Sequence, residues 1–354
     1  MAPSDWDLVQ RVRAGNRDAF RMLVERYQSR IAALAGIDEA IAFDMGGTST
    51  DVCLIAGGRA ERASERAVGG LPIRLPTVDL QTVGAGGGSL VWRDAGGAVR
   101  VGPQSAGADP GPACYGRGGT QATVTDANLL LGRLPERLAG GVELDRAAAE
   151  RALAGVDPAD IVAVVNAEML RALRLVSVER GHDPGGFALV AFGGAGPLHA
   201  CELADELGMR TVLVPEVAGV LSALGLAASE ERRDTVRSYL LPLREAGELP
   251  REGEADLRYA GQSFELTVPL QDDLAAAFHR AHEHQYGFSE REREIELVAV
   301  RTAEIRTGPA VELPSSDETR VTGPAVVELR GSTCWVPPGW VGVRDGRTLR
   351  LTRA

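Results

Sequence analysis

Long apolar runs are lacking in this chain of 354 residues: no stretch approaches eighteen consecutive apolar residues, and the charged N-terminus has no apolar core of the kind found in secretion signals. We therefore expect no membrane-spanning helix and a cytoplasmic protein. Basic residues are outnumbered too, because 38 Lys and Arg stand against 49 Asp and Glu and give a net charge of −11. This excess of negative charge argues against nucleic acid or an anionic membrane as the main partner.

Closely spaced cysteines are also missing. The four cysteines lie far apart and form no Cys-X-X-Cys motif, so the sequence predicts neither a disulfide framework nor a structural zinc site. Three histidines do lie close together, at His279, His282 and His284. On a helix the third would face away from the first two, and no nearby Cys or Asp completes a ligand shell, so we expect no metal there.

The chain does contain an apolar segment that ends in Asp-X-Gly-Gly-Thr and continues directly into a second strand-like segment. This loop is not a Walker A motif, because it lacks Gly-Lys-Ser/Thr and no helix follows it. Gly46 and Gly47 allow positive φ and can bring N–H groups close to a phosphate. Thr48 and Thr50 add hydroxyl donors, and Asp44 can hold Mg²⁺ through water. Taken alone, Gly-Gly-Thr also fits an ordinary hairpin turn.

Four further motifs follow this loop along the chain, at residues 83–89, 105–116, 123–128 and 192–200. Together with the loop, which is similar to the phosphate loops of the actin, Hsp70 and sugar-kinase ATPases, they resemble the hydantoinase A/5-oxoprolinase family. Two long runs carry the resemblance, Phe-Asp-Met-Gly-Gly-Thr-Ser-Thr-Asp-Val and Ala-Asp-Pro-Gly-Pro-Ala-Cys-Tyr-Gly-Arg-Gly-Gly. The resemblance extends from about Ile41 to the C-terminus.

The resemblance implies an α/β fold whose main part, residues 40–230, is an actin/Hsp70-like (ribonuclease H-like) ATPase lobe. Strands punctuated by Gly and Pro predict a separate β-rich domain over 250–354. Family members look about twice as long, with an N-terminal lobe that carries another Asp-X-Gly-Gly-Thr loop. Because this sequence has one such loop, we expect the first lobe to be missing.

The first 39 residues have a different pattern from the rest. Apolar residues on one helical stripe, broken near Gly15, and arginines elsewhere predict a helical hairpin. The pattern resembles the opening helices of region 2 in extracytoplasmic-function sigma factors, but the match ends before the parts that bind polymerase and promoter in that family. We therefore favour a hairpin left by a gene fusion or a misassigned start over promoter recognition.

The resemblance also implies ATP and Mg²⁺ as cofactors, and it assigns site residues to three groups. The catalytic candidates are Asp44, Asp51 and Asp126, and Asp44 is also the metal ligand. The nucleotide-binding candidates are Asp44, Gly46, Gly47, Thr48, Thr50, Gly86, Gly87, Gly193, Gly194 and Gly196. The substrate-binding candidates are Asp109, Cys114 and His199.

Three of these assignments have structural alternatives. Asp126 also suits an Asx-turn or a helix N-cap. His199, in the first turn of a predicted helix over 197–207, could equally be a half-buried capping residue. Residues 193–196 could form a tight helix–strand contact, although the free N–H groups of a helix N-terminus favour an anion.

The function implied by the resemblance is ATP-dependent hydrolysis of cyclic amides of the hydantoin or 5-oxoproline type. ATP would phosphorylate the amide oxygen, and a hydantoinase B-like partner subunit would complete ring opening of the small cyclic amide; oligomerisation is left open. One alternative is a subunit of an enzyme of the acetone or acetophenone carboxylase type. Others are a catalytically inactive lobe that serves in binding or assembly, and a regulator that binds polymerase through the sigma-like hairpin.

Overall fold

The computed structural model describes residues 37–63, 66–68, 71–73, 77–138, 141–227, 231–306 and 317–354. In this part of the chain, residues 231–306 form a smaller compact unit and the remaining residues form a larger one. The predicted helical hairpin over 1–39 lies outside the described residues, except for its last three positions. None of the helices described is long and apolar enough to cross a membrane.

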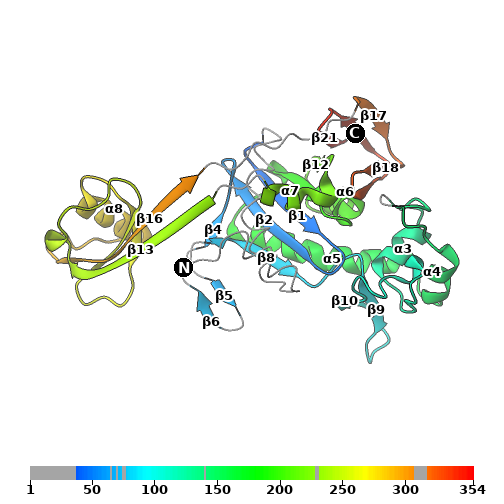
Figure 1. Ribbon diagram of the computed structural model, residues 1–354, viewed down its shortest axis with the longest axis horizontal. Helices are drawn as coiled ribbons and strands as arrows, with labels where there is room; N and C mark the ends of the chain where they lie inside the picture. Colours follow the sequence, from blue (N-terminus) through cyan, green and yellow to red (C-terminus); the bar gives the residue numbers. More distant parts are fainter. Residues whose placement is uncertain are drawn as a thin grey trace. The chain divides into compact units, whose positions relative to one another are not determined.

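A nine-stranded sheet is the centre of the larger unit (Figure 1). Its order is β17-β20-β21-β12-β11-β1-β2-β3, and β8 also pairs with β2. The sheet strands are β1 (Ala40–Met45), β2 (Thr50–Ala56), β3 (Arg59–Ala60), β8 (Leu80–Val83), β11 (Ala188–Phe192), β12 (Thr211–Pro215), β17 (Thr319–Thr322), β20 (Trp340–Arg344) and β21 (Thr348–Arg353). The apolar strand β11 runs parallel to both β1 and β12 and is buried along its whole length, as expected for central strands covered on both faces. Strand β2 returns antiparallel beside β1.

Two longer helices pack against this sheet. Helix α5 (Pro158–Val176) contacts β2 and β8, and it begins at Asp157, whose side chain accepts a hydrogen bond from the Ala159 N–H. Its buried residues recur three or four positions apart, which is the pattern of a helix with one apolar face. Helix α6 (Gly196–Glu206) follows β11 and packs on β11 and β12.

The larger unit also contains shorter helices and two-stranded pairs. The helices are α3 (Val124–Leu130), α4 (Arg146–Ala152) and α7 (Leu221–Ala227), with short 3₁₀ turns that include η1 (Ala113–Tyr115) and η4 (Ala218–Val220). The strand pairs are β4 (Arg62–Ala63) with β7 (Thr77–Val78), β5 (Arg66–Val68) with β6 (Leu71–Ile73), β9 (Ser89–Arg93) with β10 (Val99–Ser105), and β18 (Ala325–Leu329) with β19 (Ser332–Val336).

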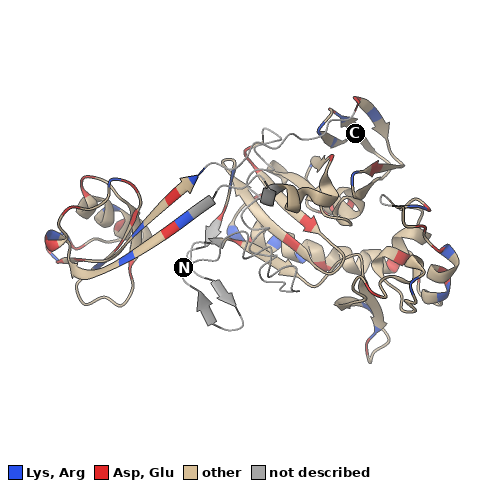
Figure 2. Ribbon diagram, viewed as in Figure 1, with Lys and Arg blue, Asp and Glu red and all other residues tan. Residues whose placement is uncertain are grey.

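The smaller unit is a four-stranded antiparallel sheet with one helix. Its strand order is β13-β16-β14-β15, and its elements are β13 (Glu231–Pro242), β14 (Glu254–Tyr259), β15 (Leu266–Pro269), β16 (Ile295–Arg306) and α8 (Leu274–Tyr286). Leu257, Tyr259, Phe278 and Leu297 are fully buried in a core of its own. Charged residues of both signs occur along β13 and β16 (Figure 2), with Arg233 opposite Glu304 in the register, an arrangement that favours strand pairing.

The prediction of one β-rich domain over 250–354 is wrong for both of its ends. The smaller unit already includes β13, which begins at Glu231. Residues 317–354 return to the larger unit, where β21 pairs antiparallel with β12 and extends the central sheet. The alternation of side chains identifies a strand, but it does not say which strand will be its neighbour.

Candidate functional site

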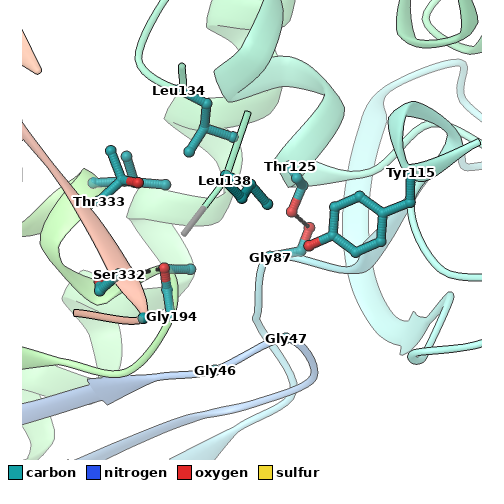
Figure 3. Close-up of a pocket in the computed structure, with 13 residues that line it drawn as sticks. Gly46, Gly47, Gly87, Tyr115, Thr125, Leu134, Leu138, Gly194, Ser332 and Thr333 are labelled. Carbon is teal, nitrogen blue, oxygen red and sulfur yellow. Dashed lines mark hydrogen bonds between the residues drawn. The ribbon is translucent and has the colours of Figure 1, made fainter. Parts of the chain in front are cut away.

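A pocket of about 180 Å³ lies in the larger unit where β1 and β11 end, and it opens to solvent (Figure 3). Bare backbone lines it at Gly46, Gly47, Gly87, Gly194 and Gly331, and hydroxyl side chains line it at Tyr115, Thr125, Ser332 and Thr333. The apolar wall consists of Leu134, Leu138, Ala195 and Leu198. None of these lining residues is charged.

The turn between β1 and β2 presents free N–H groups at this pocket. The Gly46 N–H donates to the Ser49 carbonyl (3.0 Å), and the carbonyls of Gly46 and Gly47 accept hydrogen bonds from the N–H groups of Gly87 (3.0 Å) and Gly88 (2.7 Å). Among the described residues, nothing accepts a hydrogen bond from the N–H of Gly47 or Thr48. The neighbouring loop thus satisfies the carbonyls of the turn and leaves donors for an anion.

Neither backbone conformation nor packing in the described residues requires glycine at Gly47 or Gly194. Neither has a positive φ, so the predicted need for positive φ at Gly46 and Gly47 is wrong. A Cβ added at Gly47 or Gly194 would meet nothing within 4 Å. Because neither conformation nor packing requires glycine, the open space beside these two residues is suited to close approach by a ligand.

Other glycines of the predicted site serve packing. A Cβ on Gly86 would lie 2.6 Å from the Gly47 carbonyl carbon, and one on Gly87 would lie 2.9 Å from the Thr125 hydroxyl. Gly193 has φ +81°, and a Cβ there would overlap Met45 and Asp44. These residues hold two glycine loops against the β1–β2 turn, and of the three only Gly87 lines the pocket.

The N-terminus of α6 supplies a second set of donors. Its N-cap residue, Ala195, makes no side-chain capping bond, and Pro197 occupies the first turn. The turn before it is fixed by hydrogen bonds from the Gly193 N–H to the Ala218 carbonyl and from the Ala195 N–H to the Met45 carbonyl, both 3.0 Å. The Gly194 N–H has no acceptor among the described residues. An uncapped helix N-terminus beside free N–H groups suits a negatively charged ligand.

Asp44 and Asp51 form a pair of carboxylates beside this turn. They stand directly opposite each other on β1 and β2. The Ser222 hydroxyl donates to Asp44 (3.0 Å) and the Thr82 hydroxyl donates to Asp51 (2.5 Å). Burial raises the pKa of Asp44 from 3.8 to about 7; the hydrogen bond from Ser222 opposes this shift, and the charge of Asp51 adds to it. Magnesium sites often use one or two carboxylates completed by water and phosphate, so this pair fits that ion.

The carboxylate pair does not itself line the pocket. Gly193 packs against Asp44, and the next residue, Gly194, lines the pocket wall. A ligand that contacts both Asp44 and the pocket would therefore lie along the turn at 193–194. Within the described ranges, no three His, Cys, Asp or Glu side chains cluster as metal ligands.

Asp126, predicted as catalytic, has the structural role that the sequence left open. It is fully buried at the third position of α3 and forms a capping box with Thr123. Its carboxylate also accepts hydrogen bonds from the N–H groups of Ala113 (3.3 Å) and Cys114 (2.7 Å). Asp126 therefore joins α3 to the 3₁₀ turn η1 and does not reach the pocket.

His199 and Cys114, predicted to contact substrate, are both buried. The His199 Nδ1–H donates to Asn166 Oδ1 (2.8 Å), because the Asn166 amide N–H is used by Glu202 (3.0 Å). The His199 Nε2 then accepts from the Asn128 amide (3.2 Å). Burial, together with the charge of Arg133, lowers the pKa of His199 to about 3, so the ring is neutral. Burial also raises the pKa of the Cys114 thiol far above its ordinary value.

The remaining predicted residues lie in different environments. Thr50 is buried and donates to the Ala85 carbonyl (2.7 Å), so its hydroxyl is used inside the protein. The Thr48 hydroxyl lies 3.4 Å from that of Ser105, and neither residue lines the pocket. Gly196 is buried in the first turn of α6, and Asp109 is exposed and outside the pocket lining.

Several lining residues were not predicted. Thr125 binds the Gly87 carbonyl through both its N–H (2.7 Å) and its hydroxyl (2.8 Å), and Ser332 donates to the Gly193 carbonyl (2.9 Å). Figure 3 shows Ser332 and Thr333 across the cavity from Thr125 and Tyr115. Thr125 belongs to the motif at 123–128, whereas Gly-Ser-Thr at 331–333 carries only a turn signal.

Comparisons of the sequence identify related proteins. The family model described as Hydantoinase/oxoprolinase matches residues 27–235. The caprolactamase subunit alpha of Pseudomonas jessenii is 33% identical, in a match that covers 91% of this chain and 59% of the relative. An uncharacterized protein of Methanocaldococcus jannaschii is 38% identical, with 87% of this chain and 57% of the relative covered. 5-Oxoprolinase 1 of Arabidopsis thaliana is 33% identical over 78% of this chain and 26% of its own length.

Solved structures agree with these relationships. The crystal structure of the ATP-dependent caprolactamase from Pseudomonas jessenii matches with a TM-score of 0.69 and 31% identity, covering 94% of this chain and 61% of that one. A nucleotide-free acetone carboxylase has a TM-score of 0.76 at 23% identity, over 92% of this chain and 60% of its own, and shows the shared α/β fold alone. The chain thus spans less than two thirds of the length of these relatives.

Proposed function

Because the chain belongs to the hydantoinase/oxoprolinase family, we propose that it forms the ATP-binding part of an enzyme that hydrolyses cyclic amides. The observation that carries this proposal is the open space beside Gly47 and Gly194 at one end of the pocket. Free backbone N–H groups lie beside that space, and the part of the apolar wall formed by Leu134 and Leu138 lies on the other side of the pocket (Figure 3). A nucleotide has the same two parts, an anionic tail and a flat, mostly apolar base.

Different parts of the larger unit would bind the phosphates and the metal ion of such a ligand. The β1–β2 turn and the N-terminus of α6 would bind the phosphates through main-chain N–H groups, since no charged side chain lines the pocket. Asp44 and Asp51 would hold Mg²⁺ beside them. Bound ATP supplies a phosphoryl group that can make an amide carbonyl more electrophilic. The loop between two strands, followed by the strand–helix unit of β11 and α6, supports an actin-like interpretation of the lobe.

A partner subunit and the hydrolase branch belong to the same proposal. Two relatives above 30% identity carry the names caprolactamase and 5-oxoprolinase, both of which act on cyclic amides, and the former is called a subunit alpha. We therefore favour a lactam or related ring as the substrate over the carboxylase branch. A hydantoinase B-like subunit would complete ring opening.

Calorimetric titration with MgATP tests the proposal. The variants Gly47→Ala and Gly194→Ala place a methyl group in space that the protein leaves open, so we expect unchanged thermal unfolding and an ATP affinity at least about tenfold lower, or ~1.4 kcal/mol. Gly186→Ala is the matched control, because Gly186 also has open space and no positive φ but precedes β11 at its other end. Equal affinity in all four proteins, or no binding by the wild type, contradicts the proposal.

An inactive binding or assembly module would give a different result in a second assay. With a hydantoinase B-like subunit and a small lactam added, an active subunit hydrolyses ATP faster than without the lactam. A module that binds ATP but shows no lactam-dependent hydrolysis would leave the assembly role in place of the enzymatic one.

A further inference from the structure

The hairpin of β18 and β19 is fixed firmly against the wall of the pocket. At its tip, the Arg330 N–H donates to the Glu216 carbonyl (3.1 Å), and the Gly219 N–H donates to the Arg330 carbonyl (3.3 Å). The Arg344 guanidinium holds the nearly buried Glu216 carboxylate with two hydrogen bonds, 2.8 and 2.6 Å long. A segment far along the chain from the phosphate loop therefore contributes a defined part of the site.

Two hydroxyl residues next to this tip, Ser332 and Thr333, differ in their hydrogen bonding. Ser332 donates to the Gly193 carbonyl and so supports the turn that carries Gly194. Thr333 is 3% exposed, and its side chain has no hydrogen-bond partner among the described residues. Its oxygen is not enclosed, because Asn128 Oδ1 is the single fully enclosed and unpaired side-chain oxygen or nitrogen in that part of the chain. The Thr333 hydroxyl therefore opens into the pocket that the residue lines.

Thr333 lies between the two ends of the pocket. Trp335 is two residues further along β19, so its side chain is on the same face of the strand. Trp335 packs in one apolar cluster with Leu134 and Leu138, and the Arg133 guanidinium lies 5.8 Å from its ring centre. On the other side, Ser332 contacts the glycine turn. A ligand that reaches from the free N–H groups to the apolar wall would pass the Thr333 hydroxyl.

We propose that the Thr333 hydroxyl is a specificity-determining contact that hydrogen-bonds the sugar or the base edge of the bound nucleotide. This inference rests on the proposed ATP site and adds a residue to it. An unpaired polar group in a nearly buried position is costly unless a ligand or water satisfies it. A hydroxyl can donate or accept, which matches the hydroxyls and ring nitrogens of a nucleoside, whereas the charged phosphates are matched by the N–H groups at the other end.

Paired titrations test this assignment. Thr333→Val keeps the shape and removes the hydroxyl, and Thr333→Ser keeps the hydroxyl. Each full-length protein is titrated with MgATP and with magnesium tripolyphosphate, which lacks the nucleoside. We expect Thr333→Val to bind ATP about three- to tenfold more weakly, as for one lost neutral hydrogen bond, and to bind tripolyphosphate as the wild type does. Thr333→Ser should bind both ligands within about twofold of the wild type.

The outcomes distinguish a failure of this inference from a failure of the proposed ATP site. If the wild type binds ATP and Thr333→Val binds it equally well, the hydroxyl does not contact the nucleoside and the inference is overturned while the ATP site stands. An equal loss of ATP and tripolyphosphate affinity in Thr333→Val also overturns it, because the contact would then lie at the phosphates. A wild type that binds neither ligand overturns both. Thermal unfolding of each variant checks that the hairpin remains folded.

Discussion

Asp44 is a carboxyl group whose environment favours its protonated form. Burial is the largest cause of its raised pKa, about 7 against an ordinary 3.8, and the facing carboxylate of Asp51 adds to it. A group whose pKa is higher in the folded than in the unfolded protein stabilises the fold while it is protonated. That contribution is complete below about pH 4 and is lost as the pH rises through 7.

We therefore expect Asp44→Asn to stabilise the larger unit, and to do so more strongly at high pH. The gain in the free energy of unfolding at pH 8 should exceed the gain at pH 5 by about 2 kcal/mol. Urea unfolding at the two pH values in Mg²⁺-free buffer measures the difference. Asp109→Asn, at an exposed position of the same unit, serves as the control and should change neither value by more than about 0.5 kcal/mol. A gain that is equal at pH 5 and pH 8 would show that Asp44 is charged throughout.

At the scale of single residues, the sequence predicted which residue types gather at the site better than it predicted their roles. Gly47 and Gly86 look alike in the sequence, yet one faces open space and the other packs against the first. Asp126 and His199 occur within motifs, but the polar side-chain atoms of both make hydrogen bonds within the protein. Such roles depend on which side chains become neighbours in space, and this information is spread over distant parts of the chain.

At the scale of elements, the ion pair between Glu216 and Arg344 connects the end of β12 to β20 and supports the β18–β19 hairpin. The side chains of Glu216 and Arg344 are 7% and 20% exposed. Removing one partner leaves the other charge poorly solvated, which is costly for a pair buried to this degree.

Arg344→Met should lower the free energy of unfolding of the larger unit by about 2 kcal/mol and should also weaken MgATP binding, because residues 331–333 would lose their support. Chemical unfolding and calorimetric titration measure the two effects. Arg350→Met removes an exposed arginine from the neighbouring strand β21 and should leave both unchanged. If Arg344→Met destabilised the protein but bound ATP as tightly as the wild type, the hairpin would have no part in the site.

The central strands and helices could be predicted from the sequence, whereas the strand partners near the C-terminus could not. Apolar runs over β1, β2, β11 and β12 carry a strong local signal, because these strands are buried along most or all of their length. Strands β20 and β21 also show alternating burial, but the pairing of β21 with β12 is a long-range contact. The predicted domain from 250 to 354 therefore failed where the chain returns to the larger unit.

At the scale of the whole molecule, the smaller unit is an insertion into the larger one. The first and last residues of its long strands, Glu231 and Arg306, are paired in the register of β13 and β16. Paired residues on antiparallel strands have Cα atoms about 5 Å apart. The unit has its own apolar core, and all residues that line the pocket belong to the larger unit.

Replacing residues 231–306 by a short Gly-Ser linker should therefore leave the larger unit folded, with MgATP affinity within about threefold of the full chain. Differential scanning calorimetry should show the loss of one unfolding component, and titration should show that binding is kept. A folded deletion variant that no longer binds ATP would mean that the smaller unit contributes to the site.

The most direct measurement of the central claim is a crystal structure of the chain with Mg²⁺ and a non-hydrolysable ATP analogue. We predict phosphate oxygens within hydrogen-bonding distance of the N–H groups of Gly47 and Gly194, with the base against Leu134 and Leu138. A nucleotide bound at another place, or a pocket that protein atoms fill when the nucleotide is present, would contradict the account.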